Sequence, residues 1–320
     1  MDNLIFSLNA TAPVFALMVL GYLFRKLGLI DEHAASWMNK FVFKAALPVL
    51  VFKDLAAQDF AAAWNGKFVL FCFVVTAVSI AVITLISKAV VKDKAKRGEF
   101  IQASYRSSAA LLGIAFIHNI YGDSASGMGP LMILGSVPLY NIFAVIVLML
   151  TAEEKENSSK NKKALIRSTL YGIVTNPIII GIAVGLIWSL LKIPQPKIFK
   201  TIVSDVAALA TPLGLMSMGA TFEFKKALKD IKPALIAAFI KLFVLAAIFL
   251  PVAVALGFTG EQIVAILVML GSATTVSCYI MAKSMGHEGT LSSSVIMLTT
   301  FGCSFSLTLW LFVLRSLGVI

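Results

Sequence analysis

The stretch KFVLFCFVVTAVSIAVITLISKAVV, residues 67–91, decides the fold class. Between Lys67 and Lys88 it carries no charged residue. About 20 apolar residues are enough for a helix to cross the hydrocarbon layer of a membrane. The whole chain shares this composition, since 59% of its 320 residues are hydrophobic and only 13% are charged. Soluble domains carry about 25% charged residues. The sequence therefore predicts an all-α integral membrane protein.

Ten apolar runs follow one another along the chain, and all are long enough for membrane helices. A membrane β-barrel would instead show alternation in segments of about ten residues. The fourth and ninth runs are the most polar. The predicted transmembrane spans are 4–24, 36–56, 67–91, 101–121, 128–151, 165–191, 200–222, 233–256, 261–285 and 290–318.

Basic residues are unequally divided between the two sets of connectors. Connectors after the odd-numbered spans hold 17 lysines and arginines, and the opposite side holds six. The positive-inside rule places the first set in the cytoplasm. We therefore expect a multi-pass protein of the inner cell membrane with both termini outside and a cytoplasmic loop at 152–164. Because the net charge of +11 comes from these connectors, the lipid bilayer is the expected partner and nucleic acid is not.

An internal repeat is visible when the sequence is shifted by 164 residues. A repeat of five spans enters the membrane from the opposite side the second time, so the halves 1–151 and 165–320 are predicted to be inverted. Inverted repeats are typical of secondary transporters, although an ancient duplication without a transport role is the alternative. The coinciding pairs are Pro13 and Pro177, Gly21 and Gly185, Pro48 and Pro212, and Gly122 and Gly286.

Small polar residues fill the fourth and ninth spans at equivalent places in the two halves. Residues 104–122 are SYRSSAALLGIAFIHNIYG, and residues 271–286 are GSATTVSCYIMAKSMG. Hydroxyl side chains can satisfy backbone groups that a broken helix frees. Open helix N-termini would then offer N–H groups to an anion. Close helix packing would favour the same residue types, but the matched location favours a binding site.

Charged and amide residues inside the spans are the next candidates, because each charge is costly at the centre of a bilayer. Lys241 lies deep in the eighth span and is expected to meet a carboxylate, either of the protein or of a substrate. Arg106 is a second cation, which could also snorkel to the surface. Asp205 is the candidate for ion coupling. Asn141 could bind a ligand or a neighbouring helix.

The sequence contains no arrangement typical of an enzyme. It lacks a hydrolase triad, paired carboxylates, a zinc set and a Walker phosphate loop. Its three cysteines, Cys72, Cys278 and Cys303, lie in apolar runs without metal-ligand spacing. No metal, no cofactor and no catalytic residue are expected.

Two strings carry a resemblance to a known family. They are TPLGLMSMGATF at 211–222 and SATTVSCYIMAKSMG at 272–286. With the ten-span repeat, they make the chain resemble bacterial malate and malonate permeases of the auxin efflux carrier family, in the bile acid, arsenite and riboflavin transporter superfamily. The resemblance implies a scaffold of spans 1, 2, 6 and 7. It also implies a mobile group of spans 3–5 and 8–10, which moves as an elevator, with broken spans 4 and 9 crossing at the substrate site.

Several positions carry the family's substrate motifs over to this chain. The family's span 4 motif is similar to Asn, four residues, Gly, one residue, Pro. Ser108 takes the place of its Asn, and Gly113 keeps its Gly. Ala115 replaces its Pro. In span 9, Thr274 stands where the family has Pro, and Ser277 stands where it has Asn.

The leading hypothesis is a secondary transporter of small organic anions, mono- or dicarboxylates or auxin-like weak acids. The expected substrate-binding residues are Ser108, Gly113, Asn141, Thr274, Ser277, Lys241 and Arg106. A sodium-coupled anion symporter of the bile-acid type is one alternative, and a membrane sensor without transport is another. The scaffold face could support a homodimer.

Overall fold

The computed structural model describes residues 13, 16–57, 64–109, 113–121, 127–152, 171, 174–222, 228 and 230–320. Every regular element in these ranges is a helix. The predicted loop 152–164 and the starts of spans 4–24 and 165–191 lie almost wholly outside them. The all-α prediction holds for the described residues.

Helices of the first half begin with a helical segment at 16–26. The next helix contains a π-helical turn, η1, ahead of Pro48. The fourth predicted span is divided into two short helices. The bounds are α2 Glu32–Phe41, η1 Val42–Ala46, α3 Leu47–Ala56, α4 Gly66–Val90, α5 Lys94–Tyr105, α6 Ile114–Tyr121 and α7 Met128–Thr151.

Helices of the second half follow the same order. A turn at Leu209 separates two helices ahead of Pro212, and the ninth predicted span is again divided. The bounds are α9 Pro177–Leu190, α10 Lys197–Ala208, α11 Ala210–Ala220, α13 Ile231–Phe239, η4 Ile240–Val244, α14 Leu245–Ala255, α15 Glu261–Gly271, α16 Ser277–Ser284 and α17 Thr290–Ser316.

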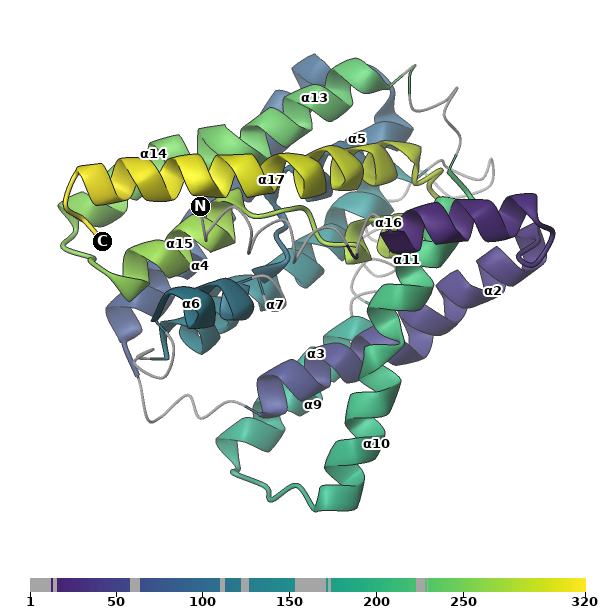
Figure 1. Cartoon of the computed structure of the whole chain (residues 1–320), viewed down its shortest axis with the longest axis horizontal. Helices are drawn as coiled ribbons and strands as arrows, with labels where there is room; N and C mark the ends of the chain where they lie inside the picture. Colours follow the sequence, from purple (N-terminus) through teal and green to yellow (C-terminus); the bar gives the residue numbers. More distant parts are fainter. Residues whose placement is uncertain are drawn as a thin grey trace.

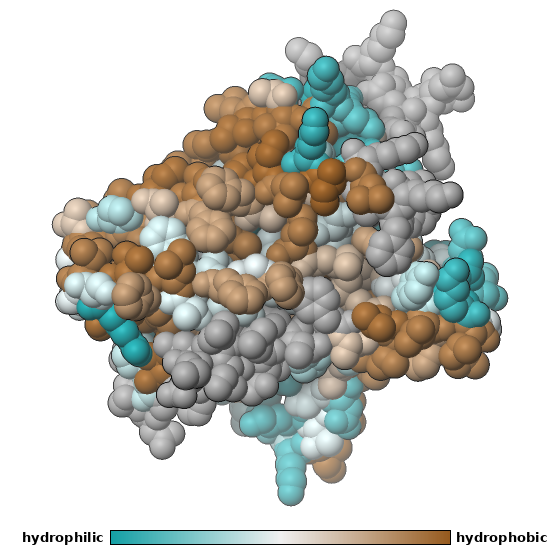
Figure 2. Space-filling model, turned by 45° about the horizontal axis from the view of Figure 1, so that its top comes forward, coloured by the Kyte–Doolittle hydropathy of each residue, from teal (hydrophilic) through white to brown (hydrophobic). Residues whose placement is uncertain are grey.

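Five helical stretches among the described residues are long and apolar enough to cross a membrane. They are 66–90, 128–151, 197–220, 231–255 and 290–316. Figure 2 shows hydrophobic residues covering broad bands along the helices, while hydrophilic residues gather toward the extremities of the molecule. A surface of this kind is stable in lipid, where apolar side chains need no burial in protein.

The helices pack into two groups (Figure 1). In one group α3 packs against α9 and α10, and α2 packs against α11. In the other, α4, α5 and α7 pack together with α13, α15 and α17. The groups meet where α16 contacts α2, η1 and α11, and where α7 contacts α9. This grouping coincides with the division into scaffold and mobile spans that the family resemblance implies.

Two glycines let helices of the first group approach backbone to backbone. A Cβ at Gly21 would overlap the backbone of Met216 in α11. A Cβ at Gly185 of α9 would lie 3.0 Å from the carbonyl oxygen of Phe52 in α3. Gly185 lies 164 residues after Gly21, and Met216 lies 164 residues after Phe52. The two contacts are therefore related by the same shift. The helix 16–26 therefore packs on α11 as α9 packs on α3.

Two glutamates cap helices across the two halves. Glu99 of α5 accepts hydrogen bonds from the backbone N–H groups of Gly289 and Ser292, both 2.9 Å, at the start of α17. Glu261 of α15 accepts one from the N–H of Met128, 2.9 Å, at the start of α7. A carboxylate at a helix N-terminus satisfies free N–H groups and favours the helix dipole. Glu99 of the first half thus caps α17 of the second half, and Glu261 of the second half caps α7 of the first.

We expect Gly21→Leu to destabilise the first group strongly. The new side chain would meet backbone atoms of Met216, which cannot rotate away, and overpacking costs about 1–3 kcal/mol or more. Thermal unfolding of the detergent-purified protein should occur about 5–10 °C lower. Gly66→Ala, at the open first turn of α4, is the control and should leave the transition within about 2 °C. Equal transitions for wild type and Gly21→Leu would contradict the packing.

Candidate functional site

The chain leaves helical geometry at two places that lie side by side. After α5, Arg106 is extended, with φ −71° and ψ 133°. After α15, Ser272 is extended, with φ −80° and ψ 169°. The backbone N–H of Ser108 donates to the carbonyl oxygen of Ala273 over 2.9 Å. The two interruptions are therefore joined directly to each other.

Hydroxyl groups satisfy backbone groups that the interruptions free. Ser107 Oγ and Tyr140 Oη donate to the carbonyl oxygen of Met269, at 2.7 and 3.2 Å. Thr274 Oγ1 donates to the carbonyl oxygen of Ala103 over 2.8 Å. An unpaired backbone group at membrane depth costs several kcal/mol, so such bonds are needed where helices end inside the protein. The Ser and Thr runs thus permit two breaks without proline.

Lys241 donates hydrogen bonds to carbonyl oxygens at the C-terminal end of α15. Its side chain is fully buried in η4. Its Nζ donates to the carbonyl oxygens of Leu270, 2.6 Å, and Met269, 3.2 Å. A lysine at a helix C-terminus satisfies free carbonyls and offsets the negative end of the helix dipole.

A cavity of about 230 Å³ lies between the two groups of helices, at the interruptions. Its wall is contributed by α3, α7, α9, α11, α16 and α17 together with both interrupted segments. The polar residues on the wall are Lys53, Asp54, Arg106, Ser107, Ser108, Tyr140, Asn141, Thr211, Thr274, Thr275, Ser277 and Thr300.

Arg106 is the buried cation of this cavity, with only 2% of its surface exposed. One terminal nitrogen of its guanidinium donates to Asn141 Oδ1, 2.9 Å, and to Ser277 Oγ, 2.8 Å. The other donates to Met281 Sδ, 2.8 Å, and makes a longer contact of 3.4 Å with Gln102 Oε1. Residues from α5, α7 and α16 thus hold one guanidinium in place.

The charges and dipoles around Arg106 favour the binding of an anion in the cavity. All of its hydrogen-bond partners are neutral, and its Nε has no partner among the described residues. The positive end of the α16 dipole begins at Ser277 on the same wall. Asp54 and Lys53 of α3 also line the cavity. An anion would find a preformed cation and hydroxyl donors there.

Five predicted site residues come together on this wall. They are Arg106, Ser108, Asn141, Thr274 and Ser277. They come from three places in the sequence, and the pairing of the two interruptions brings them to one cavity.

Three predicted residues do not line the cavity. Gly113 is buried beside Met132, just before α6. Lys241 lies behind α15, as described above. Asp205 is exposed on α10. Their roles in substrate binding or ion coupling stay predictions.

Sequence reasoning missed Lys53, Asp54, Ser107 and Tyr140 on the wall. A signal existed for Asp54, because it is a carboxylate inside the apolar span 36–56, six residues after Pro48. Ser107 lies within the quoted polar run of the fourth span. Tyr140 gave no signal, since tyrosine is common within buried helices.

Comparison with known sequences identifies the family. The sequence profile described as "Membrane transport protein" matches residues 6–311. The chain belongs to this family. It is therefore a multi-pass membrane transporter, and its resemblance to auxin efflux carriers is confirmed.

Two relatives match nearly the whole chain. One, from Rhizobium meliloti (strain 1021), is named "Putative malonate transporter" and is 27% identical over 319 residues, covering 95% of this chain and 94% of its own length. The other, from Methanothermobacter thermautotrophicus, is named "Uncharacterized transporter" and is 21% identical over 309 residues, covering 96% and 98%.

Proposed function

We propose that this chain transports small carboxylates, and that Arg106 binds the carboxylate. The observation that carries the proposal is the buried guanidinium on the cavity wall, with neutral partners and an unpaired Nε. A planar guanidinium pairs with a carboxylate through two parallel hydrogen bonds. A bound carboxylate would replace neutral partners of the terminal nitrogens, such as Asn141 and Ser277 on the cavity wall, with a charged acceptor. Malonate is the first substrate to test, because a relative carries that name.

Cavity size favours a small anion over the larger anions of bile-acid carriers. Sites for drug-sized ligands have volumes of about 300–1,000 Å³, and this cavity has about 230 Å³. A dicarboxylate of a few carbon atoms would fit beside Arg106. Its second carboxylate could reach the hydroxyl groups of the interrupted segments or Lys53.

Lys241 acts in this proposal as a positioning residue rather than a ligand. The carbonyl end of α15 would repel an anion in the adjacent cavity. By donating to the carbonyls of Met269 and Leu270, the amine offsets that field and holds the interruption in shape. The N-terminal end of α16 and Arg106 then dominate the potential at the cavity.

Movement of one helix group against the other would carry the anion across the membrane. The inverted halves, 1–151 and 165–320, are supported by two pairs of contacts related by the 164-residue shift or close to it. These are the glycine contacts within the first group and the glutamate caps within the second. Alternating access in such transporters is largely a rigid-body movement around the site. We propose that α4–α7 and α13–α17 move as an elevator.

Uptake into sealed proteoliposomes tests the function. Labelled malonate, malate and indole-3-acetate should be compared, with and without imposed proton and sodium gradients. Saturable uptake of a dicarboxylate is expected. Binding without flux of any anion under any gradient, with the protein shown to be folded, would exclude the transporter proposal for these substrates and favour a sensor.

We expect Asp54→Asn to strengthen the binding of a dianion. The Asp54 carboxylate lines the same cavity as Arg106, and like charges in a partly buried site repel each other. The KM for malonate should fall about two- to fivefold, while Asp93→Asn, at the exposed N-terminus of α5 outside the cavity, should leave it unchanged. A higher KM in Asp54→Asn would indicate that the carboxylate assists binding, by holding a proton or a cation.

A further inference from the structure

A second cavity, of about 560 Å³, lies between α2 and η1 on one side and α11 and α16 on the other. Three lysines line it: Lys40 and Lys44 from α2 and η1, and Lys283 from α16. All three side chains are exposed. None of them takes part in an ion pair within the described residues. Among the described residues of the wall, Glu32 is the one carboxylate, so these residues together carry a positive charge.

Polar groups at the floor of this second cavity are partly unsatisfied. Asn39 is 6% exposed, and its Nδ2 donates to Ser284 Oγ over 3.2 Å. Its Oδ1 has no partner within the described residues. The ring of His287 contacts the carbonyl oxygens of Ala95 and Leu148, at 2.8 and 2.9 Å. Besides the three lysines, the wall therefore carries polar residues whose side chains are mostly held by other parts of the protein.

The second cavity is separated from the Arg106 cavity by α16. Ser277 and Ile280 of this helix line the Arg106 cavity, whereas Tyr279 and Lys283 line the second one, and no described residue lines both cavities. Hydrogen bonds from Asn39 to Ser284 and between Thr221 and Tyr279 tie α16 to the first group of helices. An anion in one cavity has no direct contact with the other.

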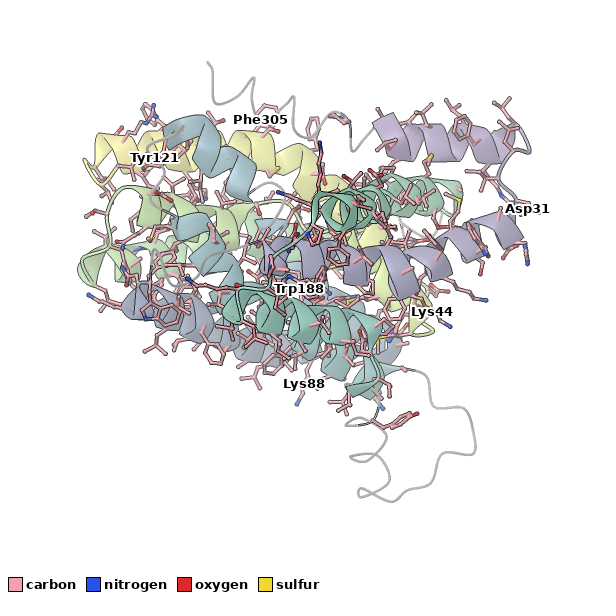
Figure 3. The ribbon with its side chains drawn as sticks, turned by 90° about the horizontal axis from the view of Figure 1, so that it is seen from below. Asp31, Lys44, Lys88, Tyr121, Trp188 and Phe305 are labelled. Atoms are coloured by element: carbon pink, nitrogen blue, oxygen red, sulfur yellow. The ribbon has the colours of Figure 1, made fainter. Side chains whose placement is uncertain are left out.

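The hydrogen bonds of His287 show which helix ends lie beside the second cavity. They reach Ala95 at the start of α5 and Leu148 near the end of α7. Lys44 lies toward one end of the molecule, as Asp31 does, and Tyr121 lies toward the opposite end (Figure 3). The second cavity is thus on the face of the basic connector 88–97, which the distribution of charge assigns to the cytoplasm.

We propose that this cavity is a second anion-binding site, at the cytoplasmic mouth of the transporter, which takes small dicarboxylates. The class of ligand rests on the proposed function. The site itself rests on the cavity, its three free lysines and the separation by α16. Clefts lined by one sign of charge concentrate counter-ions near their walls. The site would collect substrate while the Arg106 cavity is closed to that side.

A cysteine probe tests the site without requiring transport. Ser36 lines the second cavity and is exposed, while Cys72, Cys278 and Cys303 are buried. The variant Ser36→Cys, in nanodiscs of uncharged zwitterionic lipid, is treated with methanethiosulfonate reagents of opposite charge, and wild type serves as the labelling control. The anionic reagent should react about tenfold faster than the cationic one. Millimolar malonate should slow it at least about threefold.

Charge variants decide between the site and a general surface effect. Adding Lys40→Gln, Lys44→Gln and Lys283→Gln to Ser36→Cys should abolish both the charge preference and the protection by malonate. Adding Lys88→Gln, Lys92→Gln and Lys232→Gln, which removes the same charge from exposed positions outside both cavities, should preserve both. Protection should also persist with Arg106→Gln, because the sites are separate.

The outcomes separate this inference from the proposed function. Equal rates for the two reagents, or no protection by malonate, would overturn the second site even if malonate is transported. Protection that disappears with Arg106→Gln would also overturn it, because the effect would then come from the other cavity. Protection that depends on the three lysines would support the site even if no flux is detected.

Discussion

Replacing Arg106 with Gln should lower kcat/KM for malonate uptake about a hundredfold or more. The change keeps one hydrogen-bonding arm but removes the charge and the bidentate geometry. Each hydrogen bond to a charged group is worth about 1.5–3 kcal/mol, and the guanidinium would supply two to a carboxylate. Most of the loss should appear in KM. Uptake of labelled malonate by proteoliposomes, normalised to folded protein, measures the effect.

Two further variants sharpen the Arg106 prediction. Arg106→Lys keeps the charge but not the planar pair of donors, so it should recover only part of the activity. Arg97→Gln is the matched control, because Arg97 lies on α5, which ends just before Arg106, and its side chain bonds to the carbonyl oxygens of Val91 and Lys92 outside the cavity. If the Arg106→Gln and Arg97→Gln variants took up malonate equally well, Arg106 would not be a substrate-binding residue.

Replacing Lys241 with Met should reduce both stability and transport. The methionine fills similar space but leaves the carbonyls of Met269 and Leu270 without the lysine donor. The carbonyl of Met269 keeps its bonds from Ser107 and Tyr140, but that of Leu270 loses its short bond from the lysine. A buried group left unpaired costs about 1–3 kcal/mol. Thermal unfolding should therefore occur about 5–10 °C lower. Uptake by the folded protein should fall at least about tenfold, because the negative end of α15 would face the cavity uncompensated.

The control for Lys241 is Lys232→Met, at the exposed start of α13. It should change neither property. A Lys241→Met protein that is less stable but transports normally once folded would limit the lysine to a structural role. Normal stability and normal transport together would contradict the positioning role as a whole.

The polar composition of the two matched spans indicated which segments of the chain line the candidate cavity. Both runs place Ser, Thr and Gly where an apolar span would have large side chains, and they do so at equivalent places in the repeat. The individual positions Ser108, Thr274 and Ser277 came from the resemblance to the family's motifs, which fall within these two polar runs. Arg106 and Asn141 follow because each adjoins the polar run, along the chain or in the next span.

The direction of a side chain on an apolar helix could not be predicted in the same way. Lys241 is surrounded by apolar residues in sequence, and nothing there indicates that its amine reaches the end of α15 rather than the cavity. The two halves also differ here. Arg106 corresponds to Leu270 under the 164-residue shift, so each half carries its cation at a different place. An argument from the equivalence of the two halves could not locate both Arg106 and Lys241.

Asp205 and Asp54 show the same limit for carboxylates. Both lie near the prolines that the repeat makes equivalent, Asp205 before Pro212 and Asp54 after Pro48. Depth along the span favoured Asp205. The packing of α3 against α9 and α10 instead turns Asp54 to the cavity and leaves Asp205 exposed. Which face of each helix is covered depends on contacts between segments that are distant in the sequence.

Counterflow of malonate tests the central claim most directly. Proteoliposomes loaded with unlabelled malonate are diluted into a trace of labelled malonate, and internal label is followed over time. A transporter with a saturable carboxylate site should accumulate label transiently above its external concentration, and Arg106→Gln should abolish this overshoot. Label that never exceeds the external concentration in vesicles of folded wild-type protein would contradict the claim that this cavity carries malonate across the membrane.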